Sequence, residues 1–245
     1  MAWQTPKTDW SAEDGVRDDD LNRIEGNILE LRNTSNNTSD KVLYVNASTG
    51  SDSNSGAASA PFRTIGKALS VLSRNVGNYD VRISVAAGTY NESVTIKGFD
   101  APITITGTNG ASVTLTGLRI EGCHVTISNI AITLNSALWV VHGANLVCDS
   151  AIVSNGYGIT VSYCSKMFIN SLVCNNVSGY AVTVDRYSSF YVTYLDGDAN
   201  ANGITCKAGS LAAYGAINME ISGVELMTQD GGRIYSGAQT SISKY

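Results

Sequence analysis

The sequence predicts an all-β protein folded as a parallel β-helix, with three short strands in each rung and a short helix near the N-terminus. Two observations predict this fold. Residues 118–219 repeat about every 22 residues, and a repeat of that length is typical of one structural unit stacked on itself. Apolar residues alternate within each repeat, which indicates strands with one face turned inward. The 24 glycines and 3 prolines suit the many turns that such a solenoid needs.

Five copies of the repeat share three apolar positions, and we predict that these residues point into the core. Each copy opens with an alternating pair, a second pair follows seven or eight residues later, and one further apolar residue closes the copy. The first pairs are Leu118/Ile120, Leu138/Val140, Ile159/Val161, Val182/Val184 and Ile204/Cys206. The second pairs are Val125/Ile127, Leu146/Cys148, Met167/Ile169, Phe190/Val192 and Leu211/Ala213. The third positions are Ile130, Ile152, Leu172, Leu195 and Ile217.

Residues 1–40 are predicted to form a separate N-terminal segment that contains the helix and ends in a linker. Acidic Asp18 to Asp20 stand at the expected helix start, where the helix dipole favours negative charge. Four apolar residues then follow the three, four, three spacing of a coiled-coil seam. They are Leu21, Ile24, Ile28 and Leu31. A helix this short is marginal in isolation, so the seam predicts burial against copies of the chain, and the polar run 33–40 indicates a flexible linker.

Residues 41–77 are expected to begin and cap the solenoid. The segment VLYVNAS is strand-like, and a helix is predicted after the Ser/Gly/Asn loop that follows it. One face of this helix carries Ile65, Leu69 and Leu72. The first rung would otherwise expose its apolar end and its strand edges, so the helix is a natural cap. We expect the β-helix shaft in residues 78–222 and a last irregular rung with a C-terminal cap or tip in residues 223–245.

Two segments resemble known families. YVNASTGSDSNSGAASAPFRTIGKAL, residues 44–69, resembles the first segment of right-handed parallel β-helix proteins of the pectate-lyase-like superfamily, and this resemblance implies a right-handed solenoid. The opening W-x-T-P-K-T-D-W with D-L-N-R-I-E-x-N resembles the N-terminal attachment segment of tail, neck and fibre proteins from phages and prophages of Gram-positive bacteria. The second resemblance implies a virion protein. Trp3 and Trp10 flank a polar segment that cannot form a core alone, so we expect it to order against another virion protein.

The carboxylates do not predict an enzyme. Glycoside hydrolysis needs two carboxyl groups about 5 to 9.5 Å apart. One outward position of the five copies holds Glu121, Val141, Ser162, Asp185 and Lys207. Its two acids are three rungs apart, which is about 14 Å at roughly 4.8 Å per rung.

The turn LDGDANANG carries Asp196, Asp198 and Asn200 but lacks the Gly and Glu that a calcium loop needs. His124 and His142 have no acidic or nucleophilic partner at triad-like spacing, so we predict no catalytic residue, cofactor or metal.

Several side chains are expected to have structural or contact roles. Thr160, Thr183 and Thr205 share one outward position and predict a hydroxyl ladder. Three cysteines at or beside inward positions are expected to be reduced core residues. They are Cys148, Cys174 and Cys206.

Six tyrosines within 38 residues suit either packing against a sister chain, which is the simpler explanation in a trimer, or sugar stacking. They are Tyr157, Tyr163, Tyr180, Tyr187, Tyr191 and Tyr194.

Charge and hydropathy limit the partners. The net charge of −5 offers no basic surface for nucleic acid, no apolar run approaches the roughly 18 residues of a membrane span, and no signal peptide opens the chain. We therefore expect a protein made in the host cytoplasm and found in the virion, at the tail, neck or baseplate. The predicted function is a non-enzymatic, trimeric, fibre-like component of a phage or phage-like tail particle. Two alternatives stay open: a receptor-binding fibre that recognises a host surface glycan, and a tailspike depolymerase with a site between subunits.

Overall fold

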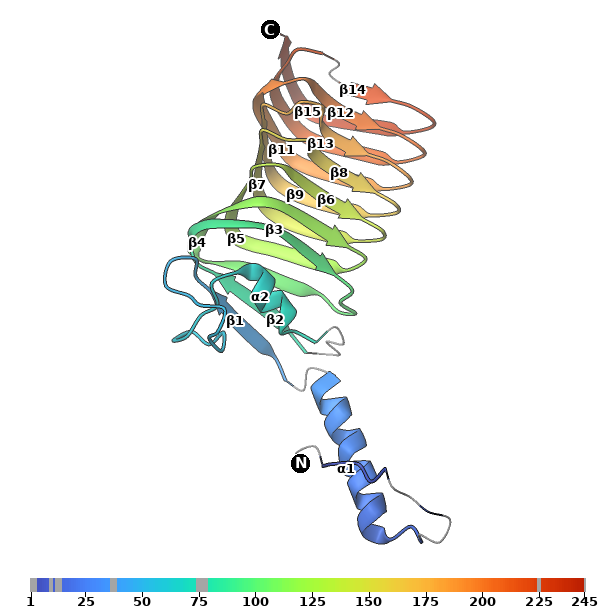
Figure 1. Ribbon diagram of the computed structural model, residues 1–245. Coiled ribbons are helices and arrows are strands. Elements are labelled where there is room, and N and C mark those ends of the chain that lie inside the picture. The colour runs from blue at the N-terminus through green and yellow to red at the C-terminus, as the bar shows by residue number, and fades with distance from the viewer. Residues whose placement is uncertain are drawn as a thin grey trace.

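The computed structural model describes residues 4–8, 11, 15–35, 39–73, 79–223 and 226–244. The chain winds as a right-handed parallel β-solenoid, with helix α1 extending from the end where the solenoid begins (Figure 1). The first elements are α1 (Asp18–Ser35), β1 (Lys41–Val45), α2 (Ile65–Ser70), β2 (Val81–Val85), β3 (Gly88–Lys97) and β4 (Ile103–Glu121). The next are β5 (His124–Leu134), β6 (Ala137–Val141), β7 (Asn145–Ser154), β8 (Gly158–Ser162) and β9 (Lys166–Asn175). The last are β10 (Tyr180–Val184), β11 (Ser189–Asn200), β12 (Asn202–Cys206), β13 (Leu211–Ile221), β14 (Leu226–Thr228) and β15 (Arg233–Lys244).

Each rung after β4 consists of one short and one long strand. The short strands β6, β8, β10, β12 and β14 stack on the C-terminal part of β4 and form what we call the first sheet. The long strands β5, β7, β9, β11, β13 and β15 stack in the same way, and each joins the second and third predicted strands into one. Their pairing shifts register partway along, for example between Ile127 and Ala131 of β5. The long strand therefore bends there, and its first part belongs to what we call the second sheet.

The inward positions agree with the repeat pattern, with two exceptions. All five first pairs are buried and lie in register across the first sheet. In the last copy, however, Ala212 and Tyr214 point inward and Leu211 is exposed, so the predicted pair Leu211/Ala213 is wrong by one residue. In the second copy, Ala151 takes the inward place that we expected for Ile152. A shift of one residue turns a side chain to the other face of a strand, and the lengths of the copies vary enough to hide it.

The turns after the short strands stack as regularly as the strands. Each turn holds two consecutive residues in the left-handed region. The pairs are His142/Gly143, Tyr163/Cys164, Arg186/Tyr187, Ala208/Gly209 and Asp230/Gly231. In each of the first four pairs the amide of the second residue donates to the carbonyl of the first residue of the next turn, as from Cys164 N to Arg186 O at 2.9 Å. This column of backbone hydrogen bonds keeps the rungs in register between the sheets.

A short helix covers the beginning of the solenoid. Helix α2 packs against β1, β2 and β3 and buries Ile65 and Leu69, and Leu72 just beyond it is buried too. The Thr64 side chain accepts a hydrogen bond from Lys67 N, and Glu92 of β3 accepts from the first two helical amides at 2.7 and 2.9 Å. These bonds satisfy amide groups that have no partner within the helix. The helix expected at this position is therefore present and is tied to the first rung.

The two ends of the chain differ from the expectation in detail. Helix α1 continues to Ser35, so the first three residues of the expected linker are helical, while residues 36–38 lie outside the described residues. At the other end, β14 and β15 pair in parallel with β12 and β13, which places the last irregular rung on the stack. A C-terminal cap or tip beyond this rung stays a prediction. Within the described ranges no helix is long and apolar enough to span a membrane.

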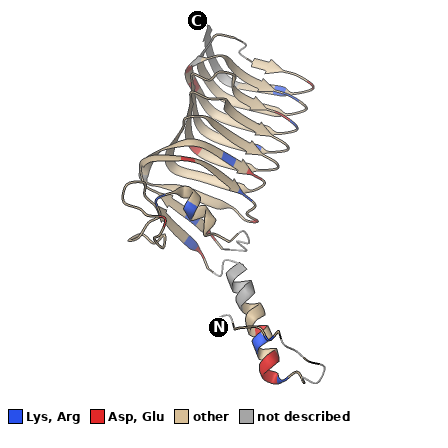
Figure 2. Cartoon of the chain, viewed as in Figure 1, with Lys and Arg blue, Asp and Glu red and all other residues tan. Residues whose placement is uncertain are grey.

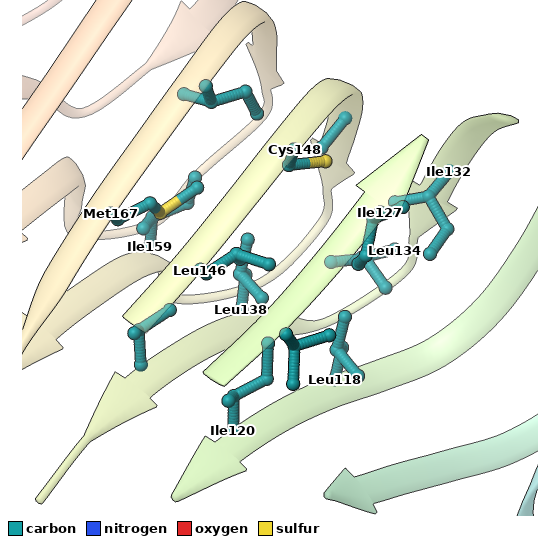
Figure 3. Packing of buried hydrophobic residues seen from close by; sticks show 14 of the residues in the cluster. Leu118, Ile120, Ile127, Ile132, Leu134, Leu138, Leu146, Cys148, Ile159 and Met167 are labelled. Carbon is teal, nitrogen blue, oxygen red and sulfur yellow. The ribbon is translucent and has the colours of Figure 1, made fainter. Parts of the chain in front are cut away.

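The core is a continuous column made mostly of aliphatic side chains, with buried thiols and aromatic rings such as Phe190 among them. Figure 3 shows Leu118, Leu138, Ile159, Leu146 and Cys148 pointing into the space between the strands. Desolvation by burial raises the pKa of the Cys148 thiol to about 12. It raises the pKa of the Cys174 thiol to about 12 as well. Cys123 and Cys206 are also buried, and Cys164 is exposed in its turn, so only one thiol of the chain faces solvent.

We predict one reactive thiol in the native protein. A thiolate is the reacting species, so buried thiols with raised pKa values react only after the rung around them opens. An aromatic disulfide reagent at pH 8 should modify one cysteine rapidly, and all five after denaturation. Cys164→Ser should abolish the rapid phase. Rapid reaction of two or more cysteines in the folded protein would contradict the described core.

Candidate functional site

The seam predicted on the N-terminal helix lies exposed on α1. Leu21, Ile24 and Ile28 are between 44% and 60% exposed. The side chain of Leu31 lies outside the described residues, as do Trp3 and Trp10. In Figure 1 the helix stands clear of the solenoid, so the described part of the chain offers this apolar face nothing to pack against.

A short stretch of the N-terminal segment does contact α1, on another side. The backbone amide of Gln4 donates to Asn27 Oδ1, and Asn27 Nδ2 donates to the Gln4 carbonyl, both at 2.9 Å. Asn27 is buried by this contact. The segment that precedes the helix therefore returns alongside it, and the described seam residues Leu21, Ile24 and Ile28 stay exposed.

A group of interacting charged and aromatic side chains lies on the outer face of the first sheet and in the turn beside it. Arg119 Nε is 3.2 Å from Glu121 Oε2, and His142 Nδ1 is 3.1 Å from Glu121 Oε1. The Arg119 guanidinium carbon lies 5.2 Å from the centre of the Trp139 ring. We call these four residues the outer cluster. Figure 2 shows how few charged residues the solenoid carries, which makes such a group uncommon in this molecule.

The outer cluster continues toward the C-terminal rungs through the stacked turns. The ring centroids of His142 and Tyr163 are 4.7 Å apart, and the Arg186 guanidinium lies 4.4 Å from the Tyr163 ring centre. Arg186 Nη1 also pairs with Asp185 Oδ2 at 3.0 Å. His142, Tyr163 and Arg186 thus form a series of contacts across three successive rungs. The left-handed turn conformation places these side chains in one column along the edge of the first sheet.

Two hollows adjoin the outer cluster. One, of about 330 Å³, is lined by Arg119, Trp139 and Tyr157 above small residues that include Gly117 and Ala137. The other, of about 440 Å³, lies between Lys97, Glu121 and His142. The terminal nitrogens of Arg119 make no hydrogen bond within the described chain, because only Nε meets Glu121. The first hollow therefore offers an aromatic wall, hydroxyl groups and a guanidinium to a small polar ligand.

The partner of His142 is a residue that the sequence argument missed. The sequence offers neither histidine an acidic partner at triad-like spacing, yet in the structure His142 contacts Glu121 of the preceding rung. The signal was present in the repeat alignment, since Val141 aligns with Glu121 and His142 follows Val141 directly. A search for partners along the chain overlooks a neighbour one rung away. His124, by contrast, stands in the second sheet next to Asn145.

The cluster lacks the pair of carboxyl groups that glycoside hydrolysis needs. The register places Glu121 and Asp185 in the same column but three rungs apart, about 14 Å at roughly 4.8 Å per rung. The hydrogen bond from Arg119 is the largest cause that lowers the pKa of Glu121, and the nearby charges of Arg119, His142 and Lys97 lower it further. Glu121 is therefore ionised at neutral pH and is a poor proton donor.

The expected calcium-like turn belongs to a strand. Asp196, Asp198 and Asn200 all lie in β11. Asn200 is fully buried, where its Nδ2 donates to Cys174 O at 2.6 Å and its Oδ1 accepts from Val177 N at 3.1 Å. Its side chain is committed to the backbone of the preceding rung. Across the described ranges no three acidic, histidine or cysteine side chains gather as a metal site would require.

The six predicted tyrosines do not share one face. Tyr157 lines the hollow beside Trp139, whereas Tyr163 and Tyr187 occupy the turns after the first sheet. Tyr191 lies on the second sheet and stacks on Phe168, and Tyr194 follows at the bend of the same strand. Tyr180 begins β10, where its hydroxyl reaches Met227 Sδ at 3.3 Å. The 38 residues that carry these tyrosines span about two rungs and so pass around every side of the solenoid. Tyrosines that are close in sequence therefore lie on different faces.

The threonine column is aligned as predicted but makes fewer hydrogen bonds than expected. Thr160, Thr183 and Thr205 lie in register across β8, β10 and β12. Thr205 is fully buried, and its Oγ1 has no hydrogen-bond partner in the described chain. At that rung the column is a packing surface and not a hydroxyl ladder.

The fold defines the chain as a parallel β-solenoid protein, with an exposed helix and an outer charged and aromatic cluster as its candidate sites. A family model described as "Protein of unknown function (DUF1565)" matches residues 48–243. The chain therefore belongs to the DUF1565 family. No curated protein and no solved structure gives a significant match.

We predict that Arg119 controls the ionisation of Glu121. Its hydrogen bond is the largest cause that holds the pKa of Glu121 below the ordinary value of a glutamate. In Arg119→Gln this pKa should rise toward that value, because the neutral amide stabilises the carboxylate less than a guanidinium does. A carbon-detected NMR titration of the Glu121 carboxyl would measure the change. Lys41→Gln, which lies on β1, is the control and should leave the titration unaltered.

Proposed function

We propose that this protein is a non-enzymatic, fibre-like component of a phage or phage-like tail particle, attached by its N-terminus and projecting a trimeric β-solenoid. The observation that carries the proposal is the exposed apolar seam on α1. The resemblance of the N-terminal segment to phage tail, neck and fibre proteins supports a place in the virion at the tail, neck or baseplate. The solenoid supplies a rigid shaft, since every rung pairs with its neighbours over most of its length.

The seam supports self-association on energetic grounds. Covering one aliphatic side chain of this size is worth about 1.5 to 3 kcal/mol. Burial of three seam residues in each of three chains would offset the free-energy cost of association. It would also stabilise the helix, which at this length is marginal on its own hydrogen bonds. Alternation of apolar residues at intervals of three and four is the pattern that parallel helices bury against one another.

The N-terminal segment supports attachment to a different protein. The contact of Gln4 with Asn27 leads this segment back along α1. Trp3 and Trp10 flank it, and large aromatic side chains in a polar segment are typical of anchors that bind a partner surface. In this proposal the helix gathers three copies, and the segment before it joins them to another virion protein.

We predict that the seam determines the oligomeric state. Light scattering on the full-length protein at micromolar concentration should give three times the chain mass of 25.8 kDa. Ile24→Asp with Ile28→Asp should weaken the trimer at least tenfold, because each buried carboxylate is costly to desolvate. Val71→Asp, which alters an exposed apolar residue next to α2, should leave the trimer intact. A wild-type protein that stays monomeric would contradict the proposal.

A receptor-binding role is a second candidate, favoured by the hollow between Trp139 and Tyr157. Its volume of about 330 Å³ suits one or two sugar units. Trp139 offers an exposed apolar ring, serine and threonine hydroxyls line the floor, and Arg119 supplies donors held in place by Glu121. Aromatic faces with nearby polar groups are a combination that binds sugars. This location differs from the tyrosine-rich flank that the sequence suggested.

We predict binding without cleavage at this hollow. Trp139→Ala should weaken binding of purified host surface polysaccharide about tenfold, because one stacking contact is lost. Tyr187→Ala removes a ring that is more exposed than Trp139 and lies elsewhere, in a turn, and it should have no effect. The polysaccharide should keep its chain length after incubation, with no new reducing ends and no unsaturated sugars. Shortening that disappears when Glu121, Asp149, Asp185, Asp196 or Asp198 is replaced by Ala would instead show a depolymerase.

A further inference from the structure

The second sheet carries an apolar stripe on its outer face. Val147, Phe168, Tyr191, Ala213 and Tyr235 pair in that order across β7, β9, β11, β13 and β15. Four rung spacings of roughly 4.8 Å make the line about 19 Å long. The three aromatic members are 41% to 52% exposed, and Leu211 beside Ala213 is exposed as well. We call these six residues the stripe.

The stripe is shaped for packing and not for sugar stacking. The rings of Phe168 and Tyr191 are 5.1 Å apart between centroids and inclined by only 7°. Because they stack along the solenoid axis, each covers a face of the other and the ring edges point outward. A sugar stacks on a ring face, so this ladder is a poor glycan site. Ala213 interrupts the ladder, and a hollow of about 650 Å³ lies there between Leu211, Arg233 and Tyr235.

The period of the stripe indicates what covers it. Its side chains recur at the rung spacing of roughly 4.8 Å, whereas an α-helix repeats every 5.4 Å and would fall out of phase within a few rungs. A second solenoid aligned with the first has the same spacing and meets the stripe at every rung. The proposed trimer already buries the seam on α1 against further copies of this chain. The same partner would therefore cover both the seam and the stripe.

Charges on the two flanks agree with that partner. Lys166 and Arg233 stand two residues before Phe168 and Tyr235, on the flank where the long strands begin. Asp149 stands two residues after Val147 on the opposite flank, and exposed Asp196 lies farther along in the same direction. In a cyclic assembly one flank of each chain meets the other flank of its neighbour. Basic and acidic flanks are then brought together.

We infer that the stripe lines the threefold axis of a homotrimer and packs against the same stripe of two further copies of this chain. The inference rests on the proposed trimer and names the surface of the shaft that forms it. The helical seam starts the association and the stripe continues it along the solenoid. The outer cluster, which lies on the first sheet, then remains on the outside of the assembly.

The test places a thiol at the stripe and asks whether it meets its own copies. In a Cys164→Ser background, Ala213→Cys should be cross-linked between chains by a short bis-maleimide reagent. Thr183→Cys on the outer face of the first sheet should not be. Phe168→Lys with Tyr191→Lys should raise the dissociation constant of the trimer at least tenfold in the full-length protein, since like charges would meet on the axis.

The outcomes separate the inference from the proposed function. Cross-linking at position 213 together with weakening by the two lysines supports the stripe as the interface. A trimeric protein in which position 213 does not cross-link would overturn the inference and leave the seam-driven trimer standing. A monomeric wild-type protein would overturn both, and the stripe would then be covered by a different protein. Circular dichroism of every variant, with an unchanged β signal, excludes unfolding as the cause of dissociation.

Discussion

The structure depends on parallel, in-register pairing between one rung and the next. A parallel strand can place its apolar residues over those of its neighbour only if both keep the same register. Five inward pairs on the first sheet satisfy this condition, and the stacked turns maintain it by hydrogen bonds of their own, as from Tyr187 N to Ala208 O. Non-glycine residues accept left-handed backbone there because the neighbouring turns leave no other conformation that preserves the column.

The same constraint creates the surface features. Side chains that share an outward position in successive rungs lie roughly 4.8 Å apart, so they interact whether or not they are close in sequence. Phe168 stacks on Tyr191 in this way, and Glu121 contacts His142, which directly follows the register partner of Glu121 in the next rung. Apolar residues that stack in successive rungs form the stripe, and charged and aromatic residues from neighbouring rungs form the outer cluster. A solenoid therefore presents extended surfaces to partners more readily than a deep active site.

The proposals assign different tasks to different faces of one shaft. The helix and the stripe are apolar and face copies of the chain, whereas the outer cluster is polar, hollowed and left free in such an assembly. The carboxylates support this division because they are separated along the axis or engaged in pairs such as Arg186 with Asp185. The DUF1565 family, to which the chain belongs, is described as one of unknown function. The functional argument therefore rests on the geometry of the candidate sites.

Repetition in the sequence by itself determined the fold class and most of the core, because inward pairs such as Leu138/Val140 recur with a fixed period. The three- and four-residue spacing of apolar residues determined the position of both helices. The pattern was less able to place Ala212 and Ala151, since a small residue carries little hydrophobic signal and one residue of turn length changes the face. The contacts of the outer cluster and the stripe were decided only by the tertiary structure. Both join residues about 20 positions apart, and their contact depends on the register between rungs, which turn lengths and backbone hydrogen bonds set together.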